Sequence, residues 1–257
     1  MSISKSISII CFCAGLLLAC SKKEDLMLCR QVPIKETGTG LLSSWVEYEY
    51  DENNRLLRTK SDGDGKVLHS NILRISYNSA GEVEKVVHNG ISMNIPLAIG
   101  YFRDSSVYEF SRKDKIITYD VTEFWEKEIF DQYTETITLN NLDLPSKIEK
   151  RDGSYYSYLY DAKGNLISAK YTHVDGPQLD IENTFTSDNK NGMFSHVNTS
   201  KWCLIFMGYI DIYNNMFPKQ NNIDQIGKFT YIYDSCGYIK AIQSPIGQTN
   251  IEYKYSE

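Results

Sequence analysis

Acidic side chains are the first candidates for chemistry in this sequence. Glu47 and Glu49 alternate along one predicted strand, so their carboxyl groups would share a face about 7 Å apart, which suits an inverting glycosidase. The loop Asp62–Gly65 is the strongest metal candidate, because short acidic loops supply oxygen ligands to calcium. Its twelfth position is Leu73, where an EF-hand needs a glutamate, so a tight turn explains the loop better. Solvated glutamates on an open strand face are likewise commoner than a catalytic pair.

Histidine and cysteine spacing indicates no cofactor. The four histidines, His69, His88, His173 and His196, lie in separate segments, and the sequence contains neither His-Glu-x-x-His nor Cys-x-x-Cys. Glycine-rich phosphate loops and the Gly-x-Ser-x-Gly nucleophile motif are also absent. We therefore expect no metal, no cofactor and no catalytic residue, and an extracytoplasmic glycan-active hydrolase is the alternative function.

The chemistry that the sequence does predict is acylation of Cys20. One cation, Lys5, precedes an apolar run that is too short to span a membrane and has the proportions of a signal peptide. The run ends at Leu17–Cys20, which resembles the lipobox of bacterial lipoproteins. In that family the peptide is removed before the cysteine, whose thiol and new amino group are then acylated. More than one acyl chain makes membrane anchoring stable.

Residues after Cys20 indicate where the protein is sent. Ser21 resembles lipoproteins directed to the outer membrane, and Lys23, Glu24 and Asp25 resemble the surface-export signal of Bacteroidota lipoproteins. An ordinary solvated tether would have the same composition. We expect a protein anchored at the outer membrane, on the periplasmic side or the cell surface, with a glycan or an envelope protein as ligand. A net charge of −6 without a basic stripe argues against nucleic acid.

Three cysteines remain once the signal peptide is removed and Cys20 is acylated. They are Cys29, Cys203 and Cys236, so at most one intramolecular disulfide can form. In an oxidising compartment Cys203 and Cys236 are the pair to test first, because Cys29 lies near the tether. Buried, unpaired thiols are the open alternative.

The elements that carry these residues follow a repeated motif. The motif starts with an aromatic or aliphatic residue. It continues with Asp or Asn, two spacer residues, Gly or a substitute for Gly, a polar residue and an aliphatic residue. The four complete copies have Tyr50, Asp51 and Asn54; Tyr77, Asn78 and Gly81; Tyr160, Asp161 and Gly164; and Tyr233, Asp234 and Gly237. A fifth copy, at Leu139, has lost the tyrosine. Asp or Asn can bond the backbone two residues on, and Gly or Asn adopts the left-handed conformation that closes a bulged hairpin. Each copy therefore predicts a hairpin corner.

The segments before these corners alternate with a period of two. Val46, Tyr48 and Tyr50 would share one face, and Glu47 and Glu49 would share the other. Such alternation is typical of antiparallel strands with one covered side, so the tyrosines should form core and cross-strand pairs. The outward charges, and strands of about six or seven residues, argue against a barrel embedded in a membrane.

This repeat resembles the YD repeats of Rhs-type proteins and, more closely, a Bacteroidota lipoprotein family of unknown function with a porin-like fold. The segments Ser187–Phe194 and Gln220–Ile223 resemble a late insertion of that family, although Gly192 and Met193 stand where a proline is expected. The resemblance implies an all-β fold. In it, an antiparallel meander of hairpins forms a large curled sheet or an open, soluble barrel, with a short helical insertion near 201–215. It transfers no catalytic residue.

We expect a single folded domain. Residues 1–19 would be the removed signal peptide, residues 20–40 the lipidated Cys and its tether, and residues 41–257 one antiparallel β domain. The lipobox, the hairpins and the missing catalytic motifs together favour a non-catalytic binding or structural module.

Overall fold

The computed structural model describes residues 29–39, 45–62, 70–90, 105–176, 180–185, 190–210, 230–244 and 247–255. Within these ranges the chain forms one sheet of 15 antiparallel strands and one α-helix, as the sequence predicted. The elements are β1 Gln31–Gly38, β2 Trp45–Tyr50, β3 Leu56–Asp62, β4 Ser70–Tyr77, β5 Val83–Gly90, β6 Ser105–Lys113, β7 Ile116–Trp125, β8 Glu128–Leu139, β9 Pro145–Glu149, β10 Tyr155–Tyr160, β11 Leu166–Thr172, β12 Ile181–Thr184, α2 Lys201–Ile210, β13 Thr230–Tyr233, β14 Ile239–Ser244 and β15 Gly247–Tyr255. Strands β6, β7 and β8, with 9, 10 and 12 residues, exceed the expected length.

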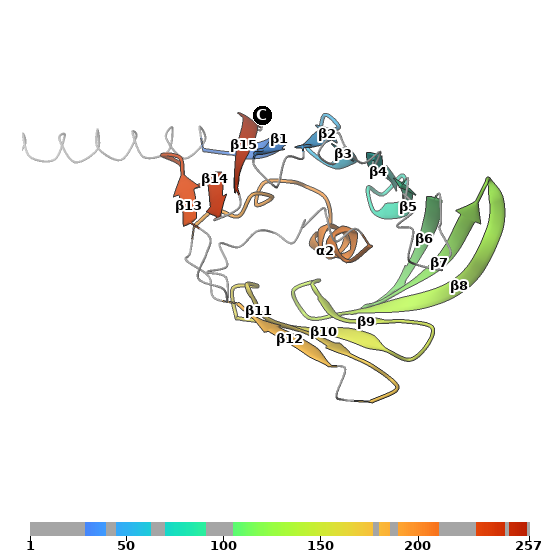
Figure 1. Ribbon diagram of the computed structural model, residues 1–257. Helices are drawn as coiled ribbons and strands as arrows, with labels where there is room; N and C mark the ends of the chain where they lie inside the picture. Colours follow the sequence, from blue (N-terminus) through green and yellow to red (C-terminus); the bar gives the residue numbers. More distant parts are fainter. Residues whose placement is uncertain are drawn as a thin grey trace, which may run out of the picture.

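The sheet is a meander with one long-range connection. Its order runs from β12 back to β1, and β1 then pairs with β15, which leads through β14 to β13. The first and last strands are therefore neighbours inside the sheet, and β12 and β13 are its two edges. Figure 1 shows the sheet curled into an open ring around α2, with the gap between those edges. The curled sheet is thus confirmed, and it remains unclosed.

Five hairpins share one turn geometry, which we call the corner. The corners are Asp51–Arg55, Asn78–Glu82, Asn140–Leu144, Asp161–Asn165 and Asp234–Tyr238. In each, the first residue exchanges backbone bonds with the fourth and fifth, and its side-chain oxygen accepts the third and fifth amides. The fourth residue has a φ between 56° and 84°, and the ladder shifts register just before every corner. The predicted bulged turns are confirmed.

All five corners lie on the same rim of the sheet. Neighbouring strands are antiparallel throughout, and β2, β4, β8, β10 and β13 occupy alternate places in the strand order. These strands therefore run in one direction and end together. We call this edge of the ring the corner rim. The opposite edge, which carries the turn Glu126–Lys127 between β7 and β8, is the far rim.

The two faces of the sheet differ in chemistry. The inner face is apolar and aromatic, and the buried tyrosines Tyr48, Tyr108, Tyr119 and Tyr158 belong to the core, as the alternation predicted. The outer face carries cross-strand ion pairs between Lys35 and Glu47, Arg58 and Glu49, and Lys85 and Glu109. Exposed pairs of this kind add little to stability, so the inner face holds the sheet together.

Helix α2 lies inside the curl and packs against β6 and β7. After Lys201 the helix is uncharged, and every residue from Trp202 to Met207 is buried. The Phe206 ring packs edge-on against Tyr108, Phe110 and Tyr119, with ring centroids 5.1–5.4 Å apart. The insertion expected near 201–215 is therefore helical over Lys201–Ile210, and residues 211–215 lie outside the described ranges.

Strand β1 lies in the segment that the sequence assigned to the tether. Residues 31–38 of the expected tether instead pair with both β15 and β2. The sequence did not predict this strand because it contains Pro33, and proline cannot donate a hydrogen bond to a strand ladder. In the structure, the ladder with β15 shifts register between Pro33 and Lys35, and such an irregularity tolerates the missing amide.

Candidate functional site

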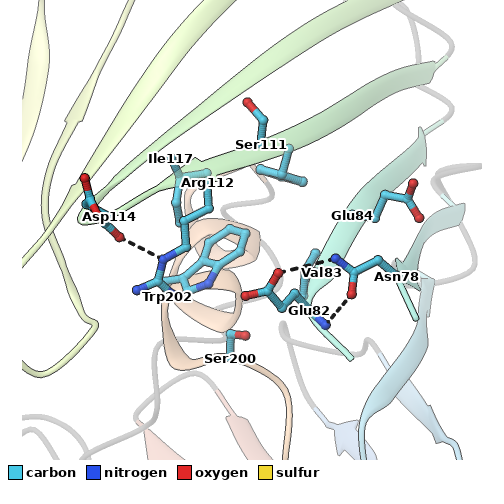
Figure 2. Close-up of a pocket in the computed structure, with 11 residues that line it drawn as sticks. Asn78, Glu82, Val83, Glu84, Ser111, Arg112, Asp114, Ile117, Ser200 and Trp202 are labelled. Carbon is cyan, nitrogen blue, oxygen red and sulfur yellow. Dashed lines mark hydrogen bonds between the residues drawn. The ribbon is translucent and has the colours of Figure 1, made fainter. Parts of the chain in front are cut away.

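A pocket opens at the corner rim where two neighbouring strands separate. The β5–β6 ladder ends at the pair Lys85 and Glu109, whereas β6 continues to Lys113 in its ladder with β7. The first residues of β5 and the last residues of β6 therefore part, and the start of α2 lies between them (Figure 2). The resulting rim pocket has a volume of about 530 Å³. It is lined by polar Asn78, Glu82, Glu84, Ser111, Arg112, Asp114 and Ser200, and by apolar Val83, Phe110, Ile117 and Trp202.

One side of the rim pocket is a corner. The Asn78 side-chain oxygen accepts the amides of Ala80 and Glu82, each at 3.0 Å, and its amide nitrogen donates to the Glu82 carboxylate at 3.3 Å. These bonds fix Glu82 at the mouth of the pocket, as Figure 2 shows. The corner motif thus positions a pocket side chain as well as turning the chain.

The other side is the turn between β6 and β7. Arg112 donates to the Asp114 carbonyl at 3.0 Å and to the Asp143 carboxylate at 2.8 Å, and Lys115 also reaches Asp143 at 2.8 Å. The Lys115 ammonium, slightly opposed by burial and assisted by Arg112, holds the pKa of Asp143 below its ordinary value. The guanidinium of Arg112 is therefore engaged with the neighbouring corner.

Aromatic side chains form the floor. Trp202 packs edge-on against Phe110 with centroids 5.2 Å apart and is only 5% exposed. Just before it, the Thr199 hydroxyl accepts the Leu56 amide at 2.8 Å and lies 2.7 Å from the Tyr77 hydroxyl. Burial raises the pKa of Tyr77, so its hydroxyl keeps its proton and donates to the Leu56 carbonyl at 2.8 Å. The floor is thereby tied to the first two corners.

The lining suits binding by hydrogen bonds over an apolar surface. Glu82, Glu84 and Asp114 are exposed, and they outnumber the single cation Arg112. Carboxylate oxygens accept hydrogen bonds from hydroxyl or ammonium groups. The pocket can therefore hold a polar ligand over its apolar floor.

The residues first considered for chemistry lie elsewhere. Glu47 and Glu49 are on the outer face, paired with Lys35 and Arg58. Asp62 ends β3, whereas residues 63–65 fall outside the described ranges. Among the residues that the structure does describe, no three His, Cys, Asp or Glu side chains form a group suited to a metal ion. The acylation site Cys20 and the residues Lys23, Glu24 and Asp25 also fall outside those ranges.

The tyrosines of the motif brace the corners from inside. The Tyr50 hydroxyl donates to the Pro33 carbonyl at 2.7 Å, and Tyr77 reaches Leu56 and Thr199 as described above. Tyr160 and Tyr233 pack against the buried core. The motif residues are therefore structural, and of the predicted set only Asn78 also lines the rim pocket.

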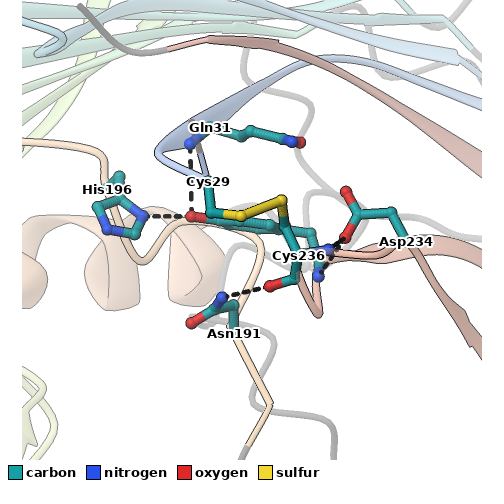
Figure 3. Close-up of a disulfide and its surroundings, with 7 residues drawn as sticks. Cys29, Gln31, Asn191, His196, Asp234 and Cys236 are labelled. Atoms are coloured by element: carbon teal, nitrogen blue, oxygen red, sulfur yellow. Dashed lines mark hydrogen bonds between the residues drawn. A yellow bond between two sulfur atoms is a disulfide. The ribbon is translucent and has the colours of Figure 1, made fainter. Parts of the chain in front are cut away.

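The disulfide joins Cys29 to Cys236, so the predicted Cys203–Cys236 pair is wrong (Figure 3). Cys29 immediately precedes β1, which starts at the corner rim beside the corner Asp234–Tyr238, and the two Cα atoms are 5.4 Å apart. Cys203 lies in α2 and is fully buried as a free thiol. Burial raises the pKa of this thiol well above its ordinary value, which makes it unreactive.

Residues 191–199 run along the corner rim and lead into α2, and we call this segment the rim strap. The Asn191 amide donates to the Gly237 carbonyl at 3.1 Å, and its side chain donates to the Cys236 carbonyl at 2.8 Å (Figure 3). Farther on, the Asn198 amide donates to the Asn54 carbonyl at 3.0 Å. The rim strap thus joins the last corner to the first before Trp202 enters the pocket floor.

Sequence reasoning missed most of the pocket. Glu84, Arg112 and Asp114 belong to no motif, and the apolar insertion gave no sign that Trp202 would line an opening. The available signal was the polar run Ser111–Lys115 between two segments rich in aromatic and β-branched residues, which is consistent with another hairpin. The pocket itself depends on where the β5–β6 ladder stops, and local spacing does not encode that point.

Comparisons with known proteins identify no family for this chain. No protein-family model matches the sequence, and no curated protein matches it. Among solved structures, the chain is similar to a porin-like protein from Bacteroides uniformis ATCC 8492, with 13% sequence identity and a TM-score of 0.34. That similarity covers 86% of this chain and 98% of the other. In the part of the chain described, no helix is long and apolar enough to cross a membrane.

Proposed function

We propose that this protein is a lipoprotein, anchored through Cys20 at the outer membrane or cell surface, whose β domain binds a ligand without chemical conversion. The observation that carries this proposal is the position of α2 inside the curl. Because this buried helix packs on the inner face over β6 and β7, that part of the concave surface is not available to a substrate. The rim pocket remains open, and we assign it as the ligand site.

A glycan fits the lining of the rim pocket best. Sugar hydroxyls donate hydrogen bonds, and the exposed carboxylates of Glu82, Glu84 and Asp114 are acceptors. Phe110, which is partly exposed and packs on the buried Trp202, offers an apolar surface for the C–H face of a sugar ring. An anionic ligand would meet net negative charge at this mouth, so a neutral or amino sugar is favoured.

A glycan-active hydrolase is the second candidate, because three carboxylates share one pocket. Hydrolysis by either stereochemical route needs one carboxyl that keeps its proton at working pH. All three carboxylates are exposed, and Glu82 already accepts a hydrogen bond from Asn78. The binding role therefore accounts for the site with fewer requirements.

Ligand binding tests the pocket assignment. We would screen the mature protein on a glycan array and measure the strongest ligand by calorimetry. Glu84→Gln should weaken the Kd about tenfold, because a hydrogen bond to a charged group is worth about 1.5–3 kcal/mol. Glu109→Gln is the matched control, since Glu109 pairs with Lys85 on the outer face beside the pocket, and its Kd should not change. Release of reducing ends that Glu82→Gln abolishes would instead establish the hydrolase.

Protease accessibility on intact cells tests the location. Digestion of the tagged protein without lysis would support the cell surface and the export role of Lys23, Glu24 and Asp25. Protection until lysis would support the periplasmic side and direct the ligand search to envelope glycans. A chain that starts at Ser21, exported behind a signal peptide that is removed without acylation, should appear in the soluble fraction, and its retention in the membrane would contradict the acyl anchor.

A further inference from the structure

We propose that the outer side of the corner rim from β7 to β11, beside the rim pocket and not over it, rests on the surface of the bilayer that holds the acylated Cys20. This inference rests on the proposed lipoprotein function, because the anchor determines which bilayer is near. The described chain starts at Cys29, and the disulfide fixes this residue to the corner Asp234–Tyr238. Nine residues, 20–28, separate the anchor from that point, and even fully extended they would span only about 30 Å.

Exposed aliphatic side chains gather on the outside of the corner rim. Ile116 is 51% exposed, Leu142 51%, Leu159 59% and Ile167 39%, and we call these four the corner patch. They come from the start of β7, a corner, the end of β10 and the start of β11, which are neighbouring parts of one rim. Leu142 also lies against the next corner. A Cβ atom built on Gly164 would be 3.6 Å from the Leu142 side chain. Single exposed aliphatics are ordinary, but a cluster at one rim indicates a surface that binds something apolar.

The charges around the corner patch favour a lipid surface. The neighbouring charged residues are Arg112, Lys113, Lys115 and Lys163 against Asp114, Asp143 and Asp161, a balance of 4 − 3 = +1 in a chain whose net charge is −6. The two neighbouring turns at the far rim have Lys127, Lys150 and Arg151 against Glu126, Glu128, Asp131 and Asp152, a balance of 3 − 4 = −1. Lysine and arginine around apolar side chains suit the phosphates and acyl boundary of an anionic bilayer. The surroundings of the corner patch are therefore net positive, whereas those of the far-rim tip are net negative.

The far rim has its own apolar tip, but the tether keeps that tip from the same bilayer. Trp125, Ile129 and Phe130 are exposed beside the β7–β8 turn, and Figure 1 shows this hairpin projecting from the ring on the side away from β1. The 12 residues of β8 extend about 40 Å from the corner rim to this tip. A tether that spans about 30 Å from the corner rim therefore holds that rim, not the tip, against the membrane.

Depth-dependent quenching tests this orientation. A fluorescent probe would be attached to Leu159→Cys in the corner patch and, in a matched chain, to Ile129→Cys at the far rim. The native cysteines do not compete, because Cys29 and Cys236 are paired and Cys203 is buried. Each full mature chain would be placed on vesicles of phosphatidylethanolamine and phosphatidylglycerol that contain spin-labelled lipid. We expect quenching at position 159 to be at least threefold stronger than at position 129. Equal quenching, stronger quenching at 129, or none at either position would overturn the proposal.

The same vesicles separate docking from acylation. In a second preparation, a histidine tag at position 20 would hold the chain to nickel-chelating lipid, while the mass of the N-terminal peptide from cells reports acylation of Cys20. An acylated chain without quenching at position 159 keeps the lipoprotein and overturns docking. Quenching at position 159 on nickel vesicles supports docking even if the peptide carries no acyl chain. In either preparation, Lys115→Glu should reduce the quenching at position 159, and Lys127→Glu should not.

Discussion

At the scale of single residues, the corners show why a short motif was so informative. Asp51, Asp161 and Asp234 begin three corners and Asn78 and Asn140 begin two, yet all five side chains accept the same pair of backbone amides. Every partner lies within four residues, so the sequence alone predicted the geometry. The Cys29–Cys236 bond spans 207 residues, and its prediction failed because spacing does not reveal which distant corner β1 meets.

Asp51 should contribute measurably to stability. Its carboxylate accepts the amides of Asn53 and Arg55 at 2.9 Å and the Arg55 guanidinium at 2.7 Å. Asp51→Ala leaves those donors unpaired and should lower the free energy of unfolding by about 1–2 kcal/mol in urea titrations. Asp51→Asn should retain most of this stability, because Asn fills the same position in two native corners. An Asn variant as unstable as the Ala variant would contradict the proposed role of the two amide bonds.

The Asp51 carboxyl should also affect stability in acid. Burial raises the pKa of Asp51, but the hydrogen bonds from Arg55 and Asn53 outweigh it, and the folded-state pKa lies below its ordinary value. A depressed carboxyl pKa gives stability that is present above the unfolded value near 3.9 and lost as pH falls through the folded value. The urea midpoint of the native protein should therefore fall below about pH 4. Asp51→Asn should reduce that fall while changing little at pH 7.

At the scale of elements, α2 and the sheet depend on each other. The all-round apolar sequence of Trp202–Met207 predicted a buried helix, and every one of these residues is buried. The position of the helix was not predictable, because it is set by contacts between distant segments such as Asn198 with Asn54 and Thr199 with Leu56. For the same reason the pocket floor at Trp202 could not be found from the sequence. Strand β1 was missed for a local reason, the proline at its irregular ladder.

Phe206 tests how strongly α2 holds the ring together. Its ring contacts three aromatic side chains from β6 and β7, and it is fully buried. Phe206→Ala should lower the free energy of unfolding by about 3–5 kcal/mol, because the cavity removes packing from both helix and sheet. Leu159→Ala is the control, since Leu159 is exposed on the outer face, and it should change stability by less than about 0.5 kcal/mol. A small loss for Phe206→Ala would mean that the sheet keeps its curl without the helix.

At the scale of the whole molecule, the first and last strands of the chain, β1 and β15, hold the sheet together. β1 pairs with β15 over seven residue pairs, and the Cys29–Cys236 bond adds a covalent link at the corner rim. The sequence predicted the curled meander because each hairpin is local and each strand alternates. The sequence did not indicate that β12 and β13 would be the free edges of the sheet. The position of these edges depends on the pairing of β1 with β15, which are far apart in the chain.

Removing the disulfide should loosen this junction. The double variant Cys29→Ser with Cys236→Ser should lower the free energy of unfolding by about 2–5 kcal/mol under oxidising conditions. Reduction of the native protein should produce a similar loss, and the double variant should be insensitive to reductant. Thiol titration of a chain that starts at position 20, with Cys20→Ala, should give one reactive thiol after unfolding without reductant, that of Cys203, and none while folded. Two further thiols in the unreduced, unfolded protein would show that the bond does not form.

The pairing of β1 with β15 also bears on how the chain folds as it is made. β1 is synthesised early and β15 last, so one side of the N-terminal strand has no partner until the protein is complete, while β2 already covers the other side. A copy truncated before Gly247 would leave that side of β1 open, and one truncated before Cys236 would also leave Cys29 as an unpaired thiol. An incomplete copy would therefore differ from a complete one by an open strand edge, which can pair with another chain and aggregate.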